Sequence, residues 1–209
     1  MNAAVVALVL FGVFGVLGFG WRSWLQHRRT GSTGFRRING GVTDWIAGAG
    51  FALALLVAVS APILQLCNVV APLSALSSGW IQYAGILIAI LGIAATVYAQ
   101  LQMGDSWRIG VDEQETTTLV RTGVFGQVRN PIYTAMFTFG FGVALVTPNI
   151  VACAGFILLV GTVELQVRHV EEPHLLRAHG DAYRAYSATV GRFVPGVGLV
   201  RWRESRRAS

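Results

Sequence analysis

Three long stretches of the chain contain no Asp, Glu, Lys or Arg: residues 1–21, 45–104 and 130–163. Because a helix needs about 20 apolar residues to cross the hydrocarbon core of a bilayer, these stretches predict five membrane-spanning helices. The first stretch has room for one helix, the second for two, and the third for two short ones. The three helices expected in the first two stretches lie at about residues 3–19, 45–66 and 80–101.

Proline and polar residues mark the breaks between these helices. Residues 68–78, which include Pro72 and several polar side chains, interrupt the second apolar stretch. Thr147, Pro148 and Asn149 interrupt the third and predict a tight turn between two antiparallel helices of about 16 to 18 residues. Helices of that length rise only about 25 Å, so we expect local thinning of the bilayer or a cavity there.

The sixteen basic residues are all Arg, and they gather on alternate loops. Five lie between residues 21 and 44, three between 105 and 129, and eight from residue 168 onward. With five spans all sixteen fall on one side of the membrane, which the positive-inside rule assigns to the cytoplasm. This predicts an N-terminus outside and a C-terminus in the cytoplasm. The first helix is expected to stay attached, because no basic segment precedes it as in a cleaved signal peptide.

The composition agrees with a membrane protein. Hydrophobic residues make up 54% of the chain and charged residues 12%, and the mean hydropathy is +0.57. A net charge of +6 would suggest nucleic-acid binding in a soluble chain, but here the positive-inside rule already accounts for the positions of the arginines. We therefore expect membrane lipids, and no nucleic acid, as partners. Low charge argues against a disordered chain, and two Cys argue against a disulfide scaffold.

Apolar and aromatic residues continue at helical intervals beyond the last span. This spacing puts them on one face of a helix that lies at the membrane surface. The fold class is thus expected to be an all-α integral membrane protein with five transmembrane helices and a C-terminal cytoplasmic amphipathic helix. The residues on this face are Leu176, His179, Tyr183, Tyr186 and Val190.

The first polar edge of the final hairpin contains Arg129, Asn130, Pro131 and Tyr133. Pro131 suits the first turn of a helix, which places Arg129 at the membrane boundary and Tyr133 about one turn deeper. Taken alone, these residues are also typical of an interfacial anchor.

The second polar edge begins with Glu164 and continues to Glu171 and Glu172. Ionisable groups near a span are costly, which makes Glu164 a functional candidate, although it could also pair with Arg129 across the hairpin. The short hairpin brings both edges to one side of the membrane. A cation, carboxylates and aromatic rings there could hold a zwitterionic cofactor, with Arg binding its carboxylate and Glu its ribose hydroxyls. The sequence contains no metal-ligand cluster of standard spacing and no phosphate-binding glycine motif, so no metal is expected.

Several short motifs follow one another between residues 102 and 195. In chain order they are Met103-Gly104-x-Ser106-Trp107-Arg108-Ile109-Gly110, Leu119-Val120-x-x-Gly123-Val124-Phe125-x-x-Val128-Arg129-Asn130-Pro131-x-Tyr133, Glu171-Glu172, Gly180-x-x-Tyr183-x-x-Tyr186 and Arg192-Phe193-Val194-Pro195.

In order and spacing these motifs resemble the isoprenylcysteine carboxyl methyltransferase family, which is related to the phospholipid N-methyltransferases. The resemblance implies that the last two helices and the C-terminal segment enclose S-adenosylmethionine, and that a lipophilic methyl acceptor enters from the bilayer. It also implies three regions: an N-terminal three-helix region over 1–101, a methyltransferase core over 102–195 and a basic tail over 196–209.

The family's Arg-His-Pro-x-Tyr motif matches this chain except that Asn130 replaces His. Asn can keep a hydrogen bond but cannot exchange a proton near neutral pH, so a base at this position is not expected. Catalytic roles are expected for Arg129, Tyr133 and Glu164. Residues expected around the cofactor are Gln127, Val128, Arg129, Asn130, Pro131, Tyr133, Glu171, Glu172, Leu176, Tyr183 and Tyr186.

Trp107 and Arg108 are candidates for the acceptor side, with an interfacial Trp–Arg anchor equally open. The expected reaction is methyl transfer to a carboxyl group of an isoprenoid or lipid-like acceptor, which is ionised at pH 7 and needs no base. Phospholipid amine methylation, a sterol-reductase-like NADPH enzyme and a non-catalytic membrane protein stay open as alternatives. The Ala-, Gly- and Val-rich, lysine-free composition resembles a bacterial chain, so the expected location is the inner (plasma) membrane with a cytoplasmic active site.

Overall fold

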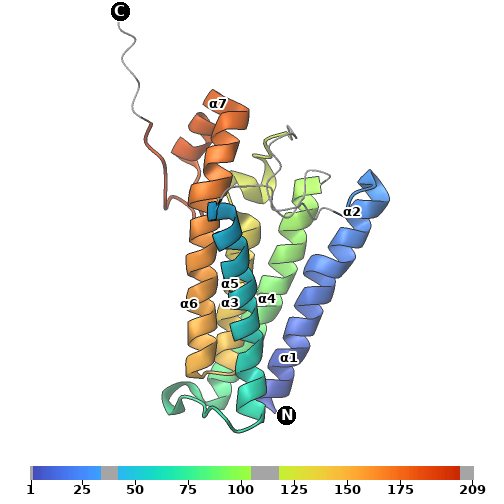
Figure 1. The fold of residues 1–209 in the computed structure, drawn as a ribbon, viewed down its shortest axis with the longest axis vertical. Coiled ribbons are helices and arrows are strands. Elements are labelled where there is room, and N and C mark those ends of the chain that lie inside the picture. The colour runs from blue at the N-terminus through green and yellow to red at the C-terminus, as the bar shows by residue number, and fades with distance from the viewer. Residues whose placement is uncertain (1, 34–41, 105–117, 203–209) are drawn as a thin grey trace, which may run out of the picture.

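The computed structural model describes residues 2–33, 42–104 and 118–202. In these ranges the regular elements are helices, which stand side by side in an elongated bundle (Figure 1). The all-α prediction is confirmed. In chain order the elements are α1 (Ala3–Phe14), η1 (Gly15–Trp21), α2 (Arg22–Thr30), α3 (Val42–Leu66), η2 (Ser74–Leu76), α4 (Gly79–Met103), η4 (Gly123–Gly126), α5 (Pro131–Val146), α6 (Ile150–Gln166), η5 (Val167–Glu171) and α7 (Glu172–Thr189).

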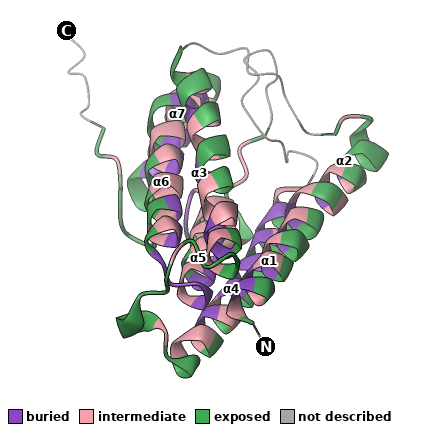
Figure 2. Ribbon diagram, turned by 60° about the horizontal axis from the view of Figure 1, so that its bottom comes forward, coloured by how far each residue is buried: buried purple, intermediate pink, exposed green. Residues whose placement is uncertain are grey.

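Within the described ranges, four continuous helices are long and apolar enough to cross a membrane. They are the helix formed by α1, η1 and α2, then α3, α4, and the helix that begins with α6. Buried positions lie where helices face one another, and exposed positions cover the outer faces (Figure 2). Large apolar side chains such as Leu56, Leu87 and Ile157 are exposed there, as a lipid-facing surface requires. The chain is therefore an integral membrane protein, and a fifth span through the 16-residue α5 stays a prediction.

The first helix is longer than the sequence predicts. It runs without a break from Ala3 to Thr30, whereas the expected span ends at residue 19. Arg22, which marks the expected boundary, is 1% exposed, and its Nη2 donates to the carbonyl oxygen of Gly104, 2.6 Å away. A buried guanidinium is tolerated where an acceptor meets it. The helix therefore continues beyond the expected end of the first span, and Arg22 is buried against the residue that follows α4.

Helices α4 and α5 pack with their backbones almost in contact. A Cβ atom on Gly92 would lie 2.7 Å from the Cα of Phe139, and one on Gly142 would lie 2.7 Å from the carbonyl oxygen of Gly85. Small residues allow this close approach between membrane helices. Phe139 also stacks on Phe14, with ring centroids 4.2 Å apart, and so ties the first helix to the pair.

The turn between α5 and α6 falls at residues 147–149, as predicted. Asn149 is fully buried, and its polar atoms are satisfied there. Its Nδ2 donates to the carbonyl oxygen of Ala61, and its Oδ1 accepts from the backbone N–H of Ala152. The two hairpin helices nevertheless make their main contacts elsewhere, α5 with α4 and α6 with α3. This arrangement leaves apolar space between them.

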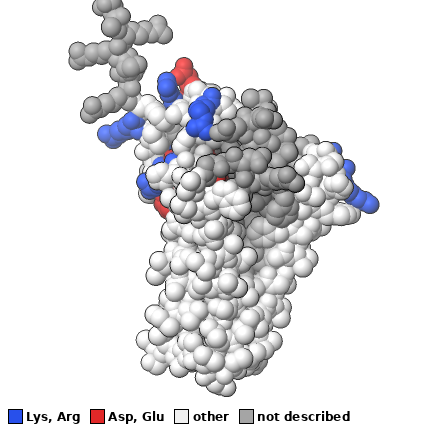
Figure 3. Space-filling view, viewed as in Figure 1, with Lys and Arg blue, Asp and Glu red and all other residues white. Residues whose placement is uncertain are grey.

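The charged side chains on the face seen in Figure 3 gather at one end of the bundle, beside α7 and α2, and the rest of that face is uncharged. The N-terminus lies at the opposite end (Figure 1). The polar motifs on both sides of the final hairpin therefore meet at the charged end.

Candidate functional site

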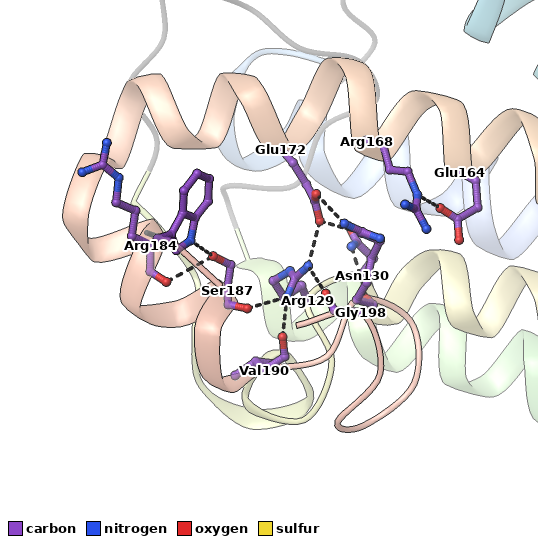
Figure 4. Close-up of polar contacts among 11 residues, drawn as sticks. Arg129, Asn130, Glu164, Arg168, Glu172, Arg184, Ser187, Val190 and Gly198 are labelled. Atoms are coloured by element: carbon purple, nitrogen blue, oxygen red, sulfur yellow. Dashed lines mark hydrogen bonds and ion pairs between the residues drawn. The ribbon is translucent and has the colours of Figure 1, made fainter. Parts of the chain in front are cut away.

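Arg129, in the turn before α5, is the centre of a polar network at this end. Its side chain is only 2% exposed. Nη1 donates to the carbonyl oxygens of Ser187, at 3.0 Å, and Val190, while Nη2 donates to Oε1 of Glu172 at 2.8 Å and to the carbonyl oxygen of Gly198 at 3.0 Å (Figure 4). One guanidinium thus holds the end of α7 and the segment that follows it, residues 190–202, against the start of α5. This segment is called the C-terminal loop below.

Glu172 receives a second cation from this loop. Arg192 donates Nε to Oε1 at 2.7 Å and Nη2 to Oε2 at 2.8 Å, a bidentate pair. Burial by itself would raise the pKa of Glu172, but the hydrogen bonds from Arg192 and Arg129 outweigh it, and the pKa is lowered. The hydrogen bond from Arg192 to Glu172 in turn raises the pKa of Arg192. The carboxylate is therefore ionised at neutral pH, between two guanidinium groups.

The backbone around Asn130 binds the same loop. The N–H of Arg129 donates to the carbonyl oxygen of Gly191 at 2.8 Å, and both the N–H and the Nδ2 of Asn130 donate to that of Arg192, at 3.1 and 3.2 Å. Pro131, at the first turn of α5 as predicted, has no N–H to satisfy. Asn130 therefore acts as a clamp on the C-terminal loop through donors that need no proton exchange.

Tyr133 and Glu171 meet as the sequence suggests. The hydroxyl of Tyr133 donates to Oε1 of Glu171 at 2.6 Å, from the first turn of α5 to the end of η5. Both residues are partly exposed. The pair therefore presents an oriented carboxylate and an aromatic ring next to the Arg129 network.

The predicted amphipathic helix is present as α7, although it is not straight. Gly180 has a φ of 49° and breaks the helical geometry, so Leu176 lies on one side of a kink and Tyr183 and Tyr186 on the other. Both tyrosines are buried, and the hydroxyl of Tyr186 donates to the carbonyl oxygen of Phe125 at 2.6 Å. The sequence could not show the kink, because glycine is also accepted in a straight helix at modest cost.

Glu164 does not pair with Arg129, so that alternative is wrong. It pairs with Arg168, one turn later on the same helix, and both side chains are partly exposed. Figure 4 shows this pair away from the Arg129 network. Arg129 already has Glu172, and the Glu164–Arg168 pair lies beside the site.

The remaining candidates form two pairs, and the structure adds two residues that the sequence did not single out. Gln127 is exposed and Val128 is buried beside Arg129. Trp107 and Arg108 lie outside the described residues. Arg192 belongs to a motif quoted above, but nothing in the sequence singles it out as a partner of Glu172. Trp202, whose Nε1 donates to Oγ of Ser187 at 3.0 Å, carries no sequence signal at all.

Residues 80–182, about half of the chain, match the model of a family described as phospholipid methyltransferase. This segment of the chain therefore resembles that family. Among solved structures it is similar to one titled the eukaryotic intramembrane Ras methyltransferase ICMT (isoprenylcysteine carboxyl methyltransferase), with a TM-score of 0.62 and 20% identity. The alignment covers 94% of this chain and 70% of that chain, which shows a shared fold. No curated protein sequence matches.

The family match and the shared fold together indicate a membrane methyltransferase. The matched segment contains Arg129, Tyr133, Glu171 and Glu172, so most of the polar cluster lies inside the family region. Arg192 lies beyond it and completes the cluster from the C-terminal loop.

Proposed function

We propose that this methyltransferase uses S-adenosylmethionine and methylates a lipophilic acceptor, most simply at a carboxylate. The observation that carries the proposal is the cluster of Arg129, Arg192 and Glu172 with the Tyr133–Glu171 pair, inside a family segment at one end of an apolar bundle. A site between the charged end and the apolar bundle can be reached by a polar cofactor from water and by an apolar acceptor from the bilayer.

The exposed part of the donor set fits part of this cofactor. The Glu171 carboxylate can accept from an ammonium group or from ribose hydroxyls, and the Tyr133 ring suits a sulfonium. In this cluster of polar side chains, Glu171 and Tyr133 are partly exposed and Arg129 is buried. We therefore assign direct contact first to Glu171 and Tyr133, and to Arg129 and Glu172 the holding of the C-terminal loop over the site. The further proposed contacts are Gln127, Val128, Asn130, Pro131, Leu176, Tyr183 and Tyr186.

When bound, S-adenosylmethionine supplies an electrophilic methyl group whose bonding electrons leave with sulfur as a neutral thioether. A carboxylate oxygen of the acceptor forms the new bond to carbon, and no proton moves. The protein's task is then orientation and exclusion of water. Asn130, which donates to a backbone carbonyl and cannot act as a base, suits this reaction. An amine or hydroxyl acceptor would need a base, for which Glu164 beside Arg168 is the candidate. Trp107 and Arg108 remain our candidates for the acceptor side.

Binding of S-adenosylhomocysteine, the product form of the cofactor, tests the proposal. At a concentration of 100 times its Kd we expect it to stabilise the protein by about 2.7 kcal/mol in a detergent melting experiment. Tyr133→Phe removes the hydroxyl that orients Glu171 and is expected to weaken binding roughly tenfold. Tyr83→Phe, at a 70% exposed position of α4, is the matched control and should bind normally. Stabilisation by NADPH alone would favour the reductase, and stabilisation by neither ligand would contradict both enzymes.

We also propose five spans with the N-terminus outside and the charged end in the cytoplasm, in a bacterial inner membrane. The support is the position of the charges at one end of the bundle and of the N-terminus at the other. A phosphatase reporter that is active only outside the cytoplasm should be active when fused after Thr147 and inactive when fused after Ser209. The reverse pattern would place the candidate site on the outer side and contradict this orientation.

A further inference from the structure

An elongated apolar cavity lies inside the membrane part of the bundle, bounded by α1, α3, α5 and α6. It encloses about 630 Å³, including the part that is open to the surroundings. Small residues on three of these helices leave the space free, and phenylalanine rings form much of the remaining wall. Examples of these small residues are Ala54 on α3, Ala144 on α5 and Ala152 on α6.

The lining offers nothing to a polar ligand. Thr147 is the one lining residue with a polar side chain, and its hydroxyl already donates to the carbonyl oxygen of Val143. Phe51 and Phe156 present aromatic rings from α3 and α6. A site of this composition takes a hydrocarbon chain, because any polar group placed there would lose its hydrogen bonds to water.

The cavity begins next to the candidate site and ends at the hairpin turn. Met136, at its near end, lies one helical turn from Tyr133, whose hydroxyl is bound to Glu171. Thr147, at its far end, belongs to a fully buried turn that Asn149 fixes to α3. The cavity therefore has a closed end opposite the polar cluster.

The distance between these ends sets a length. Tyr133 and Thr147 are separated by 14 residues of α5, or about 21 Å at the helical rise of 1.5 Å per residue. A carbon–carbon bond is about 1.5 Å long, and an extended chain advances roughly 1.3 Å per bond. A chain that starts at Tyr133 and ends at Thr147 thus has about 16 carbons.

We propose that this cavity measures the hydrocarbon chain of the methyl acceptor and selects chains of about 16 carbons, whose last carbons reach the closed end at Thr147. The inference rests on the proposed function for the identity of the occupant as the acceptor. The start of the chain at Tyr133 rests on it too, whereas the closed end rests only on the packing around Thr147.

Photolabelling in lipid nanodiscs tests the proposal without requiring turnover. The probes are straight-chain carboxylic acids of 10, 16 and 20 carbons with a diazirine on the terminal carbon, and the labelled residues are mapped by mass spectrometry. The 10-carbon acid, whose last carbon lies roughly 12 Å from Tyr133, is expected to label Gly140 and Phe156, and the 16-carbon acid Thr147 and Ala152. The 20-carbon acid should label these four residues at least tenfold less than the 16-carbon acid does.

Ala144→Phe fills the deep half of the cavity and provides the decisive variant. We expect it to reduce labelling of Thr147 and Ala152 by the 16-carbon acid at least tenfold, and to leave the 10-carbon labelling unchanged. Ala154→Phe, at an exposed position of α6, is the matched control and should leave both patterns unchanged. Ala144→Leu, a smaller change, should give an intermediate loss in a protein that melts normally.

Labels confined to lipid-facing residues such as Leu56 and Ile157, or a pattern independent of chain length, would overturn the length measurement. S-adenosylhomocysteine binding on the same preparations separates this from the proposed function. Length-dependent labelling without that binding would keep the cavity's role and contradict the methyltransferase mechanism. Binding of S-adenosylhomocysteine together with labelling that does not depend on chain length would support the proposed function and contradict the length measurement.

Discussion

Gly92→Ala is expected to lower the free energy of unfolding by about 3 kcal/mol, because the added methyl group has no space. Its Cβ would lie 2.7 Å from the Cα of Phe139, an atom that moves only if α5 itself moves. The stack of Phe139 on Phe14 would be displaced with it, so the first helix should loosen as well. Unfolding in mixed detergent micelles, followed by circular dichroism, measures the change.

Gly161→Ala is the matched control for this prediction. It lies in the middle of α6 with no atom within 4 Å of the added Cβ. Removing a flexible glycine from a helix should stabilise the protein by about 0.5 to 1 kcal/mol. Equal losses in the two variants would show that the α4–α5 contact is not the cause.

Arg129→Ala is expected to destabilise the protein by about 3 to 5 kcal/mol, because it removes several hydrogen bonds made by a buried charged group, each worth about 1.5 to 3 kcal/mol. The change leaves the carbonyl oxygens of Ser187, Val190 and Gly198 without this donor, while Glu172 keeps Arg192. The C-terminal loop should detach from the start of α5, and binding of S-adenosylhomocysteine should fall with it. Limited proteolysis of the C-terminal loop would report the detachment directly.

Arg184→Ala provides the comparison for Arg129. Arg184 pairs with Asp181 on the surface of α7, where both side chains are exposed, and such pairs contribute at most about 1 kcal/mol. We therefore expect little change in stability. If Arg129→Ala instead melted like the parent protein but lost the cofactor product, Arg129 would be a ligand contact and its role in holding the loop would be wrong.

The sequence by itself determined the class of fold and the neighbourhood of the site. Uncharged stretches of about 20 residues predict helices, since a bilayer leaves few other ways to satisfy the backbone. The turn at Thr147, Pro148 and Asn149 is local, and so is the start of α5 at Pro131. The order of motifs placed Arg129, Tyr133, Glu171 and Glu172 at one end because a short hairpin constrains its two helices to be neighbours.

The tertiary structure decided which charge meets which. Arg22 reads as the end of a span, but a carbonyl oxygen at Gly104 makes its burial possible. The sequence pattern suggests that Arg129 is a cation available to a ligand, but its N–H groups donate to carbonyl oxygens more than 50 residues away in the chain. Glu164 reads as its partner, but Arg168 lies one turn away on the same helix. Hydrogen-bond partners of buried charges come from whichever backbone the packing brings near, and the apolar pattern that specifies the helices contains no information about them.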